Sequence, residues 1–286
     1  MNTKLNYLIT CATKLATKER FYCPSCGCES ATTTSRKYIV TSLRRCSRCE
    51  LLFRTPTTTS AENETFYQES YSQGFTSDTP SDDALRELIS NNFVGSEKDH
   101  TNYIKVLAAL GGKPGDRLLD FGCSWGYGSW QLKKHGYDVA AFEISKSRCR
   151  YAREKLGIAA HDKLDDVKGE GFDIFFSAHV LEHVPAISEV FALAQKKLKK
   201  GGLFLAFTPN GSSAYRNRQG GTWSQLWGMV HPNFLDDRFY WKAFPDVLLA
   251  CNPYDYRAIS EQWASGKRAS TLKLDGVELM AAVKIK

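Results

Sequence analysis

The feature that most restricts the fold of this 286-residue chain is the run RLLDFGCSWGYG, from Arg117 to Gly128. A short apolar segment ends at an acidic residue, and a glycine-rich turn and a helical pattern over Ser129–His135 follow it. Glycines permit a tight turn and a close approach of a ligand to the backbone, and a helix N-terminus presents unpaired N–H groups. The run therefore predicts a strand, a ligand-binding turn and a helix.

The next segment completes a strand–helix–strand unit. A second strand is predicted over Asp138–Glu143, and its last residue is an acid. An acid at this point of such a unit is placed to accept hydrogen bonds from ribose hydroxyls, so we expect Glu143 to hold a nucleoside. The glycine spacing from Asp120 to Gly128, D-x-G-x-x-x-G-x-G, differs from the G-x-G-x-x-G of dinucleotide sites.

Two further strands and a helix follow the unit. A continuous apolar run predicts a buried strand over Phe172–Ser177, and an amphipathic helix over Ile187–Leu198 stops at a Gly-Gly pair before a strand over Leu203–Phe207. Together with the glycine-rich loop, two of these stretches resemble motifs of class I S-adenosylmethionine-dependent methyltransferases: FDIFFSAHVLEHV and LKKGGLFLAFTPN. The resemblance extends over about residues 100–210. This resemblance implies an α/β fold with a Rossmann-like seven-stranded methyltransferase sheet.

The resemblance also implies how S-adenosylmethionine would bind. The loop acid would serve the ammonium end of the cofactor, and Tyr67 or Tyr71 would contact its carboxylate end, although either tyrosine could simply be a packing residue. Ser124 replaces a glycine of the family pattern, which requires it to keep a negative φ. Asp162 is placed near the adenine or is an ordinary loop residue. The predicted cofactor-binding residues are Asp120, Gly122, Cys123, Gly126, Gly128, Glu143, Ile144, Asp162, Ser177, His179 and Tyr67.

The sequence HVLEH, from His179 to His183, also matches the H-x-x-E-H pattern of inverted zinc proteases. That pattern needs both histidines on one face of a continuous helix, whereas here it follows a strand directly and Pro185 comes two residues later. We therefore interpret the segment as the rim of a cofactor cleft. His183 is either a rim histidine bonded to the main chain or a catalytic group.

Four of the nine cysteines form two C-x-x-C pairs, Cys23 with Cys26 and Cys46 with Cys49, separated by 19 residues. This spacing is typical of tetrathiolate zinc sites, in which two tight turns complete a tetrahedron. Four thiolates leave no open coordination position, so the predicted zinc is structural. Cys28 is a possible substitute ligand. Two disulfides are the alternative, which the lack of a secretory signal disfavours.

The charge of the chain is concentrated in the same segment. Residues 1–56 hold ten Lys and Arg but three Asp and Glu, so the whole formal net charge of +7 lies there. We predict a basic zinc ribbon with strands at 37–40 and 51–53. Its surface could bind nucleic acid, an anionic sugar nucleotide or an acidic partner, or could simply be solvated.

The chain length suits one α/β domain with a small appendage. We predict a basic zinc-ribbon segment at 1–56, a linker and cofactor-covering segment at 57–99, and a methyltransferase domain at 100–286 with an acceptor-site insertion at about 211–237. The stretch 55–60, TPTTTS, is expected to be the linker proper. No apolar run is long enough to span a membrane, and we expect a cytoplasmic protein.

Several elements are predicted outside the motifs. A helix is expected over Leu85–Leu110 and another over Asp237–Cys251. An antiparallel strand pair is expected over Tyr254–Glu261 and Val277–Ile285.

The insertion contains HPNF, from His231 to Phe234, which resembles an element of sugar and small-molecule methyltransferases. With the zinc segment, it favours methyl transfer to a sugar or nucleotide-sugar of polysaccharide or deoxysugar biosynthesis. An acceptor hydroxyl needs a base, for which His231 is the first candidate and His183 the second. The alternatives are an RNA methyltransferase that grips RNA with the basic ribbon and a non-catalytic binding module on a methyltransferase fold.

Overall fold

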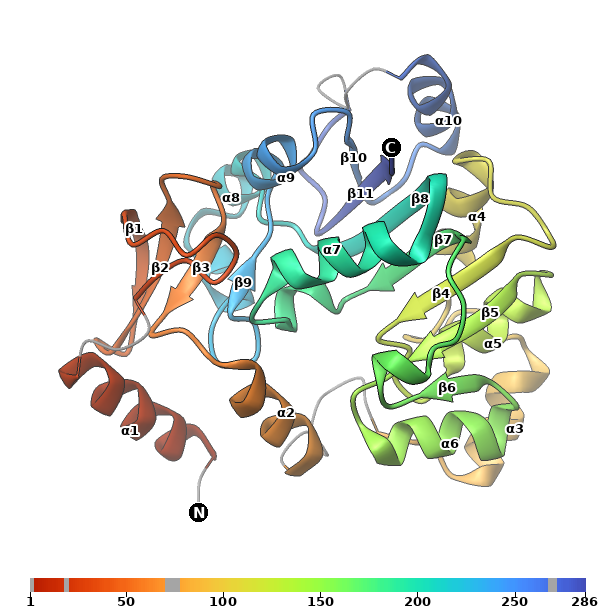
Figure 1. The fold of residues 1–286 in the computed structure, drawn as a ribbon, viewed down its shortest axis with the longest axis horizontal. Coiled ribbons are helices and arrows are strands. Elements are labelled where there is room, and N and C mark those ends of the chain that lie inside the picture. The colour runs from red at the N-terminus through yellow and green to blue at the C-terminus, as the bar shows by residue number, and fades with distance from the viewer. Residues whose placement is uncertain (1–2, 18–20, 70–77, 267–271) are drawn as a thin grey trace.

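The computed structural model describes residues 3–17, 21–69, 78–266 and 272–286, and within these ranges the chain forms a seven-stranded and a four-stranded sheet (Figure 1). From edge to edge, the strands of the larger sheet are β10 (Leu248–Cys251), β11 (Glu278–Lys284), β8 (Leu198–Pro209), β7 (Phe172–Ala178), β4 (Arg117–Phe121), β5 (Asp138–Phe142) and β6 (Ala159–His161). Strands β6, β5, β4, β7 and β8 are parallel, while β11 is antiparallel to both neighbours. The predicted Rossmann-like seven-stranded sheet is confirmed.

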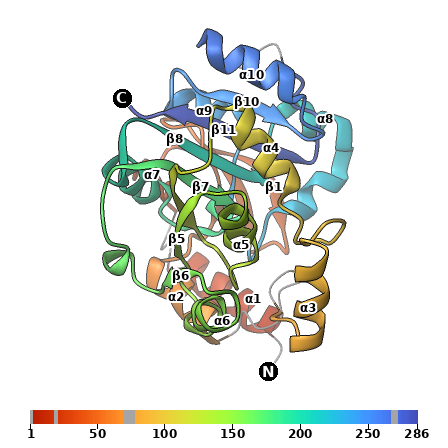
Figure 2. The same cartoon turned by 90° about the vertical axis from the view of Figure 1, so that its right-hand side faces the viewer.

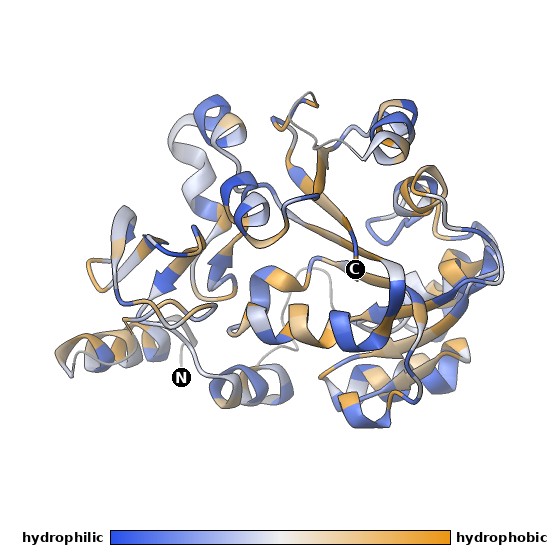
Figure 3. Cartoon of the chain, turned by 45° about the horizontal axis from the view of Figure 1, so that its top comes forward, coloured by the Kyte–Doolittle hydropathy of each residue, from blue (hydrophilic) through white to orange (hydrophobic). Residues whose placement is uncertain are grey.

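Helices cover both faces of this sheet. They are α3 (Asp82–Ser90), α4 (Thr101–Ala109), α5 (Tyr127–Lys134), α6 (Lys146–Leu156), α7 (Ile187–Lys197), α9 (Asp237–Ala243) and α10 (Tyr256–Ser265). Figure 2 shows α7 on one face and α4 and α5 on the other. Successive residues Phe175 and Phe176 of β7 are both fully buried, as expected for parallel strands covered on both sides. Figure 3 accordingly shows hydrophobic residues concentrated in the central strands.

The strand order determines where a ligand can bind. The chain passes from β4 to β5 on one side and later returns to β7 on the other side of β4. At such a switch point the loops that leave the C-terminal ends of the strands diverge and leave a crevice. The glycine-rich loop after β4 lies at this point.

The predicted helix over Leu85–Leu110 is two helices, α3 and α4. The chain reverses between them through Asn92 and Phe93, whose φ angles are 54° and 64°. The side chain of Phe93 is fully buried, and its ring packs 5.5 Å from that of Trp130. Burial of this aromatic ring compensates for the unfavourable backbone conformation, and a helical pattern in the sequence does not reveal such a contact.

The predicted C-terminal elements are also wrong in part. The helix that begins at Asp237 ends at Ala243, and the apolar residues 248–251 form the edge strand β10 instead. The predicted strand at Tyr254–Glu261 lies mostly in α10, because the side chain of Asp255 accepts a hydrogen bond from the backbone N–H of Ala258 (3.0 Å) and caps a helix there. Strand β11, which was expected, therefore pairs with β10 and β8.

The smaller sheet combines the N-terminal segment with the insertion. Its strands, in order, are β1 (Ala31–Lys37), β2 (Thr41–Cys46), β3 (Leu52–Thr55) and β9 (Asn233–Phe234), and near it lie the helices α1 (Thr3–Ala16), α2 (Ser60–Glu69) and α8 (Ser213–Gln219). The predicted strand at 37–40 is the turn between β1 and β2, where Tyr38 and Ile39 have positive φ angles. The expected strand near 51–53 is β3.

The N-terminal segment and the insertion are held together by apolar contacts and by an ion pair. Leu43 and Leu52 pack with Trp227 and Phe234 in one buried cluster. Arg45 donates a 2.5 Å hydrogen bond through Nη2 to the buried carboxylate of Asp236. The insertion and the N-terminal strands therefore share one core.

The stretch 55–60, which was expected to be a linker, connects the end of β3 to the start of α2. Thr55 and Thr57 are buried, and Ser60 already begins α2. Among the described helices, none combines the length and apolar character that crossing a membrane would require.

Candidate active site

A cavity of about 320 Å³ lies at the C-terminal ends of β4, β5 and β7. Its walls include Gly122 after β4, Glu143 after β5 and His179 after β7, and Tyr67 from α2 lines it as well. Helix α2 is attached to the rim, because Gln68 donates a 2.7 Å hydrogen bond through Nε2 to the backbone carbonyl of Ile144. The cavity therefore occupies the switch point and is partly covered by the segment that precedes the sheet.

The loop after β4 needs glycine where it approaches its neighbours. At Gly122, which has a φ of 89°, a Cβ atom would lie 2.3 Å from Cγ2 of Val180. At Gly126, a Cβ atom would lie 2.8 Å from that of Ala152 in α6. Gly128 packs against the ring of His100, where a Cβ atom would come within 2.3 Å. Gly122 thus borders the cavity, whereas Gly126 and Gly128 permit packing behind the loop.

Ser124 differs from the expectation. Its φ is +51°, not negative, so a serine occupies the left-handed conformation that favours glycine. This conformation directs the backbone N–H of Ser124 to Oε2 of Glu143, at 2.9 Å. The hydrogen bond ties the glycine-rich loop to the end of β5.

Two carboxylates lie near the loop in different positions. Glu143 lines the cavity and also accepts the backbone N–H of Ser145 at 2.8 Å, and burial raises its pKa. Asp120 is buried beneath the loop and accepts a 2.5 Å hydrogen bond from the hydroxyl of Ser129. Burial raises the pKa of Asp120 to about 7. Glu143 therefore lines the cavity, whereas Asp120 supports the loop from behind.

The predicted cofactor residues fall into two groups. Those lining the cavity are Gly122, Glu143, Ile144, His179 and Tyr67, and those outside its walls are Asp120, Cys123, Gly126, Gly128, Asp162 and Ser177. Tyr71 lies outside the described residues. Leu164, which the prediction did not include, lines the cavity two residues beyond Asp162.

His179 is held between two carboxylates. Its Nε2 lies 2.6 Å from Oε2 of Glu278, and its Nδ1 lies 3.4 Å from Oε1 of Glu182. Burial opposes the charged form of His179, but the hydrogen bonds to Glu182 and Glu278 outweigh it and raise the pKa to about 10. Glu278 also accepts hydrogen bonds from the hydroxyls of Tyr103 and Tyr254, each at 2.6 Å. An imidazolium with two carboxylates therefore borders the cavity.

Sequence reasoning missed Glu278. The residue belongs to β11 and meets His179 across 99 positions of sequence. The signal that could have found it is an acid at the start of the apolar run ELMAAV, because a carboxylate in a buried strand requires a partner.

The two candidate bases form a pair. Nδ1 of His183 lies 2.9 Å from the carbonyl of Val230, and Nδ1 of His231 lies 2.7 Å from that of Leu226, so each ring donates from Nδ1 and leaves a lone pair on Nε2. The ring centroids are 4.6 Å apart. His183 lines the cavity, whereas His231 is not among the lining residues and contacts the ring of His183. Burial lowers the pKa of His183 to about 4.

Glu182 completes this cluster. Its Oε2 atom is buried and has no hydrogen-bond partner among the described residues. One donor atom from each of Glu182, His183 and His231 lies within 4.8 Å of the others, a spacing that can also hold a cation. The zinc-protease pattern is not formed, because His183 lies in the short 3₁₀ helix Leu181–His183 whereas His179 precedes it with a φ of 55°.

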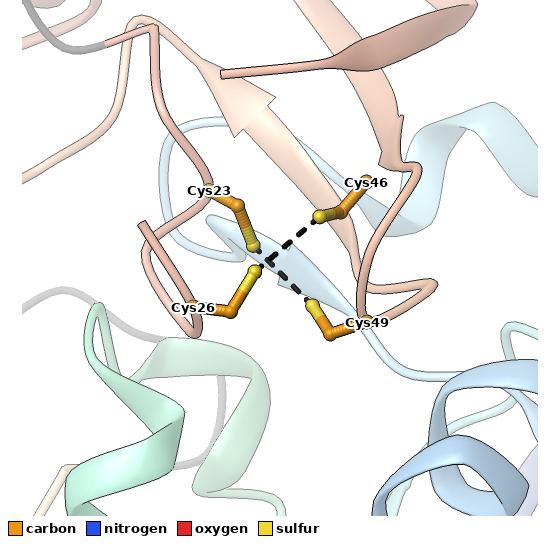
Figure 4. A group of neighbouring side chains, drawn as sticks. All are labelled: Cys23, Cys26, Cys46 and Cys49. Carbon is orange, nitrogen blue, oxygen red and sulfur yellow. Dashed lines mark hydrogen bonds between the residues drawn. The ribbon is translucent and has the colours of Figure 1, made fainter. Parts of the chain in front are cut away.

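The four paired cysteines converge at one point (Figure 4). The Sγ atoms of Cys23 and Cys49 are 3.5 Å apart, as are those of Cys26 and Cys46, and all four lie within 4.8 Å of one another. These distances exceed the roughly 2.05 Å of a disulfide and suit a tetrahedron of thiolates around zinc, with bonds of about 2.3 Å. Cys28 is not in this group and lies 3.7 Å from the hydroxyl of Ser47.

The comparison with known proteins agrees with the architecture. Residues 96–244, more than half of the chain, match the model of a family described as a methyltransferase domain. The chain therefore belongs to this family, and its fold is that of class I S-adenosylmethionine-dependent methyltransferases. This confirms the family resemblance inferred from the motifs between residues 100 and 210.

Two curated relatives and one solved structure illustrate the similarity. The chain is 32% identical over 117 residues to a ubiquinone biosynthesis O-methyltransferase of Nitrosococcus oceani, covering 38% of this chain and 48% of that protein. It is 26% identical over 163 residues to a malonyl-[acyl-carrier protein] O-methyltransferase of Serratia marcescens, covering 55% and 60% respectively. The chain thus spans about half the length of these relatives.

The structure of geranyl diphosphate C-methyltransferase from Streptomyces coelicolor A3(2) aligns with a TM-score of 0.50 and 14% identity, over 79% of this chain and 98% of that chain. This similarity concerns the fold alone.

Proposed function

We propose that this protein transfers a methyl group from S-adenosylmethionine to a hydroxyl of a small-molecule acceptor. The observation that carries the proposal is a cavity at the switch point with Glu143 on one wall and the lone-pair-bearing His183 on another. Two related proteins are named as O-methyltransferases and others as C- or N-methyltransferases, so their names support methyl transfer, while the hydroxyl acceptor rests on the geometry of the cavity.

The residues that line the cavity fit the cofactor. Glu143 would accept the ribose hydroxyls, since it lines the cavity and, among the described residues, the hydrogen bonds of its carboxylate are with the backbone N–H groups of Ser124 and Ser145, one to each oxygen. Tyr67 would cover the bound molecule, and the backbone at Gly122 and Ile144 would border it. When bound, the cofactor supplies an electrophilic methyl group. The other predicted residues, Asp120 and Gly126 among them, would shape the loop rather than contact the cofactor.

The proton of the acceptor hydroxyl would go to His183. Burial keeps its imidazole neutral near pH 7, so Nε2 has a free lone pair, but burial also makes the ring a weak base. The carboxylate of Glu182, 3.9 Å from Nε2, would stabilise the imidazolium as it forms. His231, the first candidate from sequence, would position His183 through its neighbouring ring. His179, already paired with two carboxylates, has no free basic nitrogen for this role.

The N-terminal segment is proposed to hold one structural zinc ion on Cys23, Cys26, Cys46 and Cys49. The segment 1–56 and the insertion at 211–237 would form the acceptor side of the site, while 57–99 covers the cofactor and 100–286 carries the methyltransferase fold. Pairing of β3 with β9 and the Arg45–Asp236 ion pair support this division. A sugar or nucleotide-sugar remains the favoured acceptor, because the basic charge lies on this side.

The test is methyl transfer to candidate acceptors. Purified protein is incubated with labelled S-adenosylmethionine and with nucleotide-sugars, quinols or RNA, and mass spectrometry identifies the acceptor that gains one methyl group. A methylated small molecule supports the proposal, and methylated RNA would replace it with the RNA-methyltransferase alternative.

His183→Ala should lower turnover at least a hundredfold while leaving binding of S-adenosylhomocysteine unchanged. The exposed His135 provides the control, since His135→Ala removes an imidazole far from the cavity walls.

A further inference from the structure

A second cavity, of about 550 Å³, lies between α1, α2 and the end of β3. Residues of the insertion, including Met229 and Val230, close it on another side. It is separate from the cavity that faces Glu143, and neither the methyl-transfer proposal nor the zinc site uses it. Its most unusual component is Arg54, the third residue of β3.

Arg54 is a buried cation with neutral partners. The residue is 3% exposed, and its Nε atom has no hydrogen-bond partner among the described residues. Its Nη atoms donate to the hydroxyls of Tyr7 (3.1 Å) and Thr58, and Sγ of Cys11 lies 3.8 Å away. Burial raises the pKa of Tyr7 to about 12, so this phenol stays uncharged at neutral pH and cannot serve as a counter-ion.

The other charged residues that line the second cavity neutralise each other. Lys14 and Glu62 form an ion pair of 2.5 Å, and Glu62 also accepts the backbone N–H of Thr59 at 2.7 Å. Within the described part of the chain, no carboxylate lies within ion-pair distance of Arg54, so the cavity carries one uncompensated positive charge. Hydrogen bonds and the Tyr7 ring, which lies 5.2 Å from the guanidinium carbon, offset part of the cost of burying this charge, but no counter-ion does. An anion that enters the cavity would supply one.

We propose that the second cavity binds a phosphoryl group of the methyl acceptor, with Arg54 as its ligand. A guanidinium presents a planar fork of N–H donors that matches phosphate oxygens, and the unused Nε of Arg54 is one of these donors. The hydroxyls of Tyr7 and Thr58 hold the fork in place. This inference rests on the proposed methyl transfer, because it places one end of the same acceptor.

The two cavities are adjacent, which is what a single acceptor requires. Asn63 of α2 lines both of them. Val230 lines the second cavity, and its carbonyl accepts the hydrogen bond from His183, which lines the first. An acceptor anchored at Arg54 by its phosphoryl end would therefore extend past Asn63 toward the proposed base. A nucleoside diphosphate-sugar has this division into an anionic part and a hydroxyl-bearing part.

The test is calorimetric titration of the full chain with inorganic pyrophosphate and, separately, with uridine diphosphate, each in the presence of S-adenosylhomocysteine. We expect saturable binding of one anion per chain, weakened at least tenfold by Arg54→Gln. Arg36→Gln removes the same charge from an exposed position of β1 and should leave the affinity within twofold. Ala61→Phe fills the cavity from the exposed side of α2 without altering Arg54, and it should also weaken binding.

The outcomes separate this inference from the proposal on which it rests. Intact protein that binds S-adenosylhomocysteine but no pyrophosphate, or that loses as much affinity in Arg36→Gln as in Arg54→Gln, overturns the phosphoryl site. Protein that binds no S-adenosylhomocysteine contradicts the methyl-transfer proposal instead. If Arg54→Gln does not fold, as judged by loss of S-adenosylhomocysteine binding, Ala61→Phe decides the question alone, and unchanged pyrophosphate affinity there counts against the site.

Discussion

The two sheets of this molecule are built in opposite ways. In the seven-stranded sheet, the five parallel strands follow one another along the chain between Arg117 and Pro209 with short connections. In the four-stranded sheet, the last strand comes from the insertion, so Leu52 pairs with Phe234. Bringing β3 and β9 together closes a much longer loop than any connection in the large sheet, and this costs more entropy. The smaller sheet therefore depends on strong interactions that hold its strands together.

The small sheet has two such fixed points. One is the group of four cysteines, two of which precede β1 while the other two lie at the turn from β2 to β3, and the other is the Arg45–Asp236 ion pair. The large sheet relies mainly on apolar packing of its central strands, although Leu51 and Phe53 of the N-terminal segment belong to the same buried cluster. The comparison predicts that the small sheet can be disrupted selectively while the cofactor cavity survives.

Removal of the proposed zinc ion should produce the largest effect. Structural zinc sites contribute about 10–16 kcal/mol of apparent binding energy, and a segment this small cannot replace that with its own core. Cys46→Ser should therefore unfold β1 to β3 while the seven-stranded sheet remains, because Cys46 is fully buried at the end of β2. Hydrogen exchange followed by mass spectrometry would show the loss of protection, and metal analysis should give about one zinc per intact chain.

The control for this experiment is Cys28→Ser. Cys28 lies outside the group of four sulfur atoms, so its removal should change neither the zinc content nor the protection of β1 to β3. A preparation of intact protein that is fully folded without metal would show that the cysteine group has no structural role.

The second fixed point is the buried ion pair. Asp236 is 0% exposed and also caps α9 by accepting the N–H of Phe239 at 2.9 Å. Asp236→Ala removes the cap of α9 and the closer carboxylate partner of Arg45, which keeps a longer contact to Glu50 (3.6 Å), and this should lower the free energy of unfolding by about 3 kcal/mol in urea titrations. The exposed pair of Lys155 and Asp82 is the comparison, because solvent screens this pair and Asp82→Ala should cost much less stability than Asp236→Ala. Equal losses in the two variants would contradict the importance of the buried pair.

The same contrast explains what the sequence could and could not predict. The loop from Asp120 to Gly128 is contiguous, and its strand, turn and helix signals agree, so the cavity and Glu143 were predictable. The pairing of β3 with β9 was not, because two residues of a strand carry no pattern that identifies a partner so far away. Glu278 and Arg54 were missed for a related reason. Their roles arise from neighbours that only the folded chain brings together.

A single substitution at Glu143 should weaken binding in the proposed cofactor cavity. Glu143→Ala removes the carboxylate that faces the cavity and leaves the N–H groups of Ser124 and Ser145 without their acceptor. Binding of S-adenosylhomocysteine should weaken by about 1.5–3 kcal/mol, equivalent to a factor of ten to a hundred or more, while zinc content stays constant. Calorimetry measures both the intact protein and the variant. Affinity unchanged within twofold would remove Glu143 from the proposed cofactor site.

The smallest effect concerns the strained serine of the glycine-rich loop. Ser124 has a φ of +51°, which costs a residue with a Cβ atom about 1–2 kcal/mol relative to glycine. Ser124→Gly removes this strain but increases the entropy of the unfolded chain by about 0.4–1 kcal/mol, so the net gain in unfolding free energy should be about 0.5 kcal/mol. Ser145→Gly is the matched control, because Ser145 also donates its N–H to Glu143 but has a φ of −77°. No left-handed strain is relieved there, and the 3.1 Å contact between the hydroxyls of Ser145 and Ser147 is lost in addition to the entropic cost, so thermal unfolding should shift upward for Ser124→Gly and downward for Ser145→Gly. Shifts of the same sign would show that the left-handed backbone at Ser124 stores no strain.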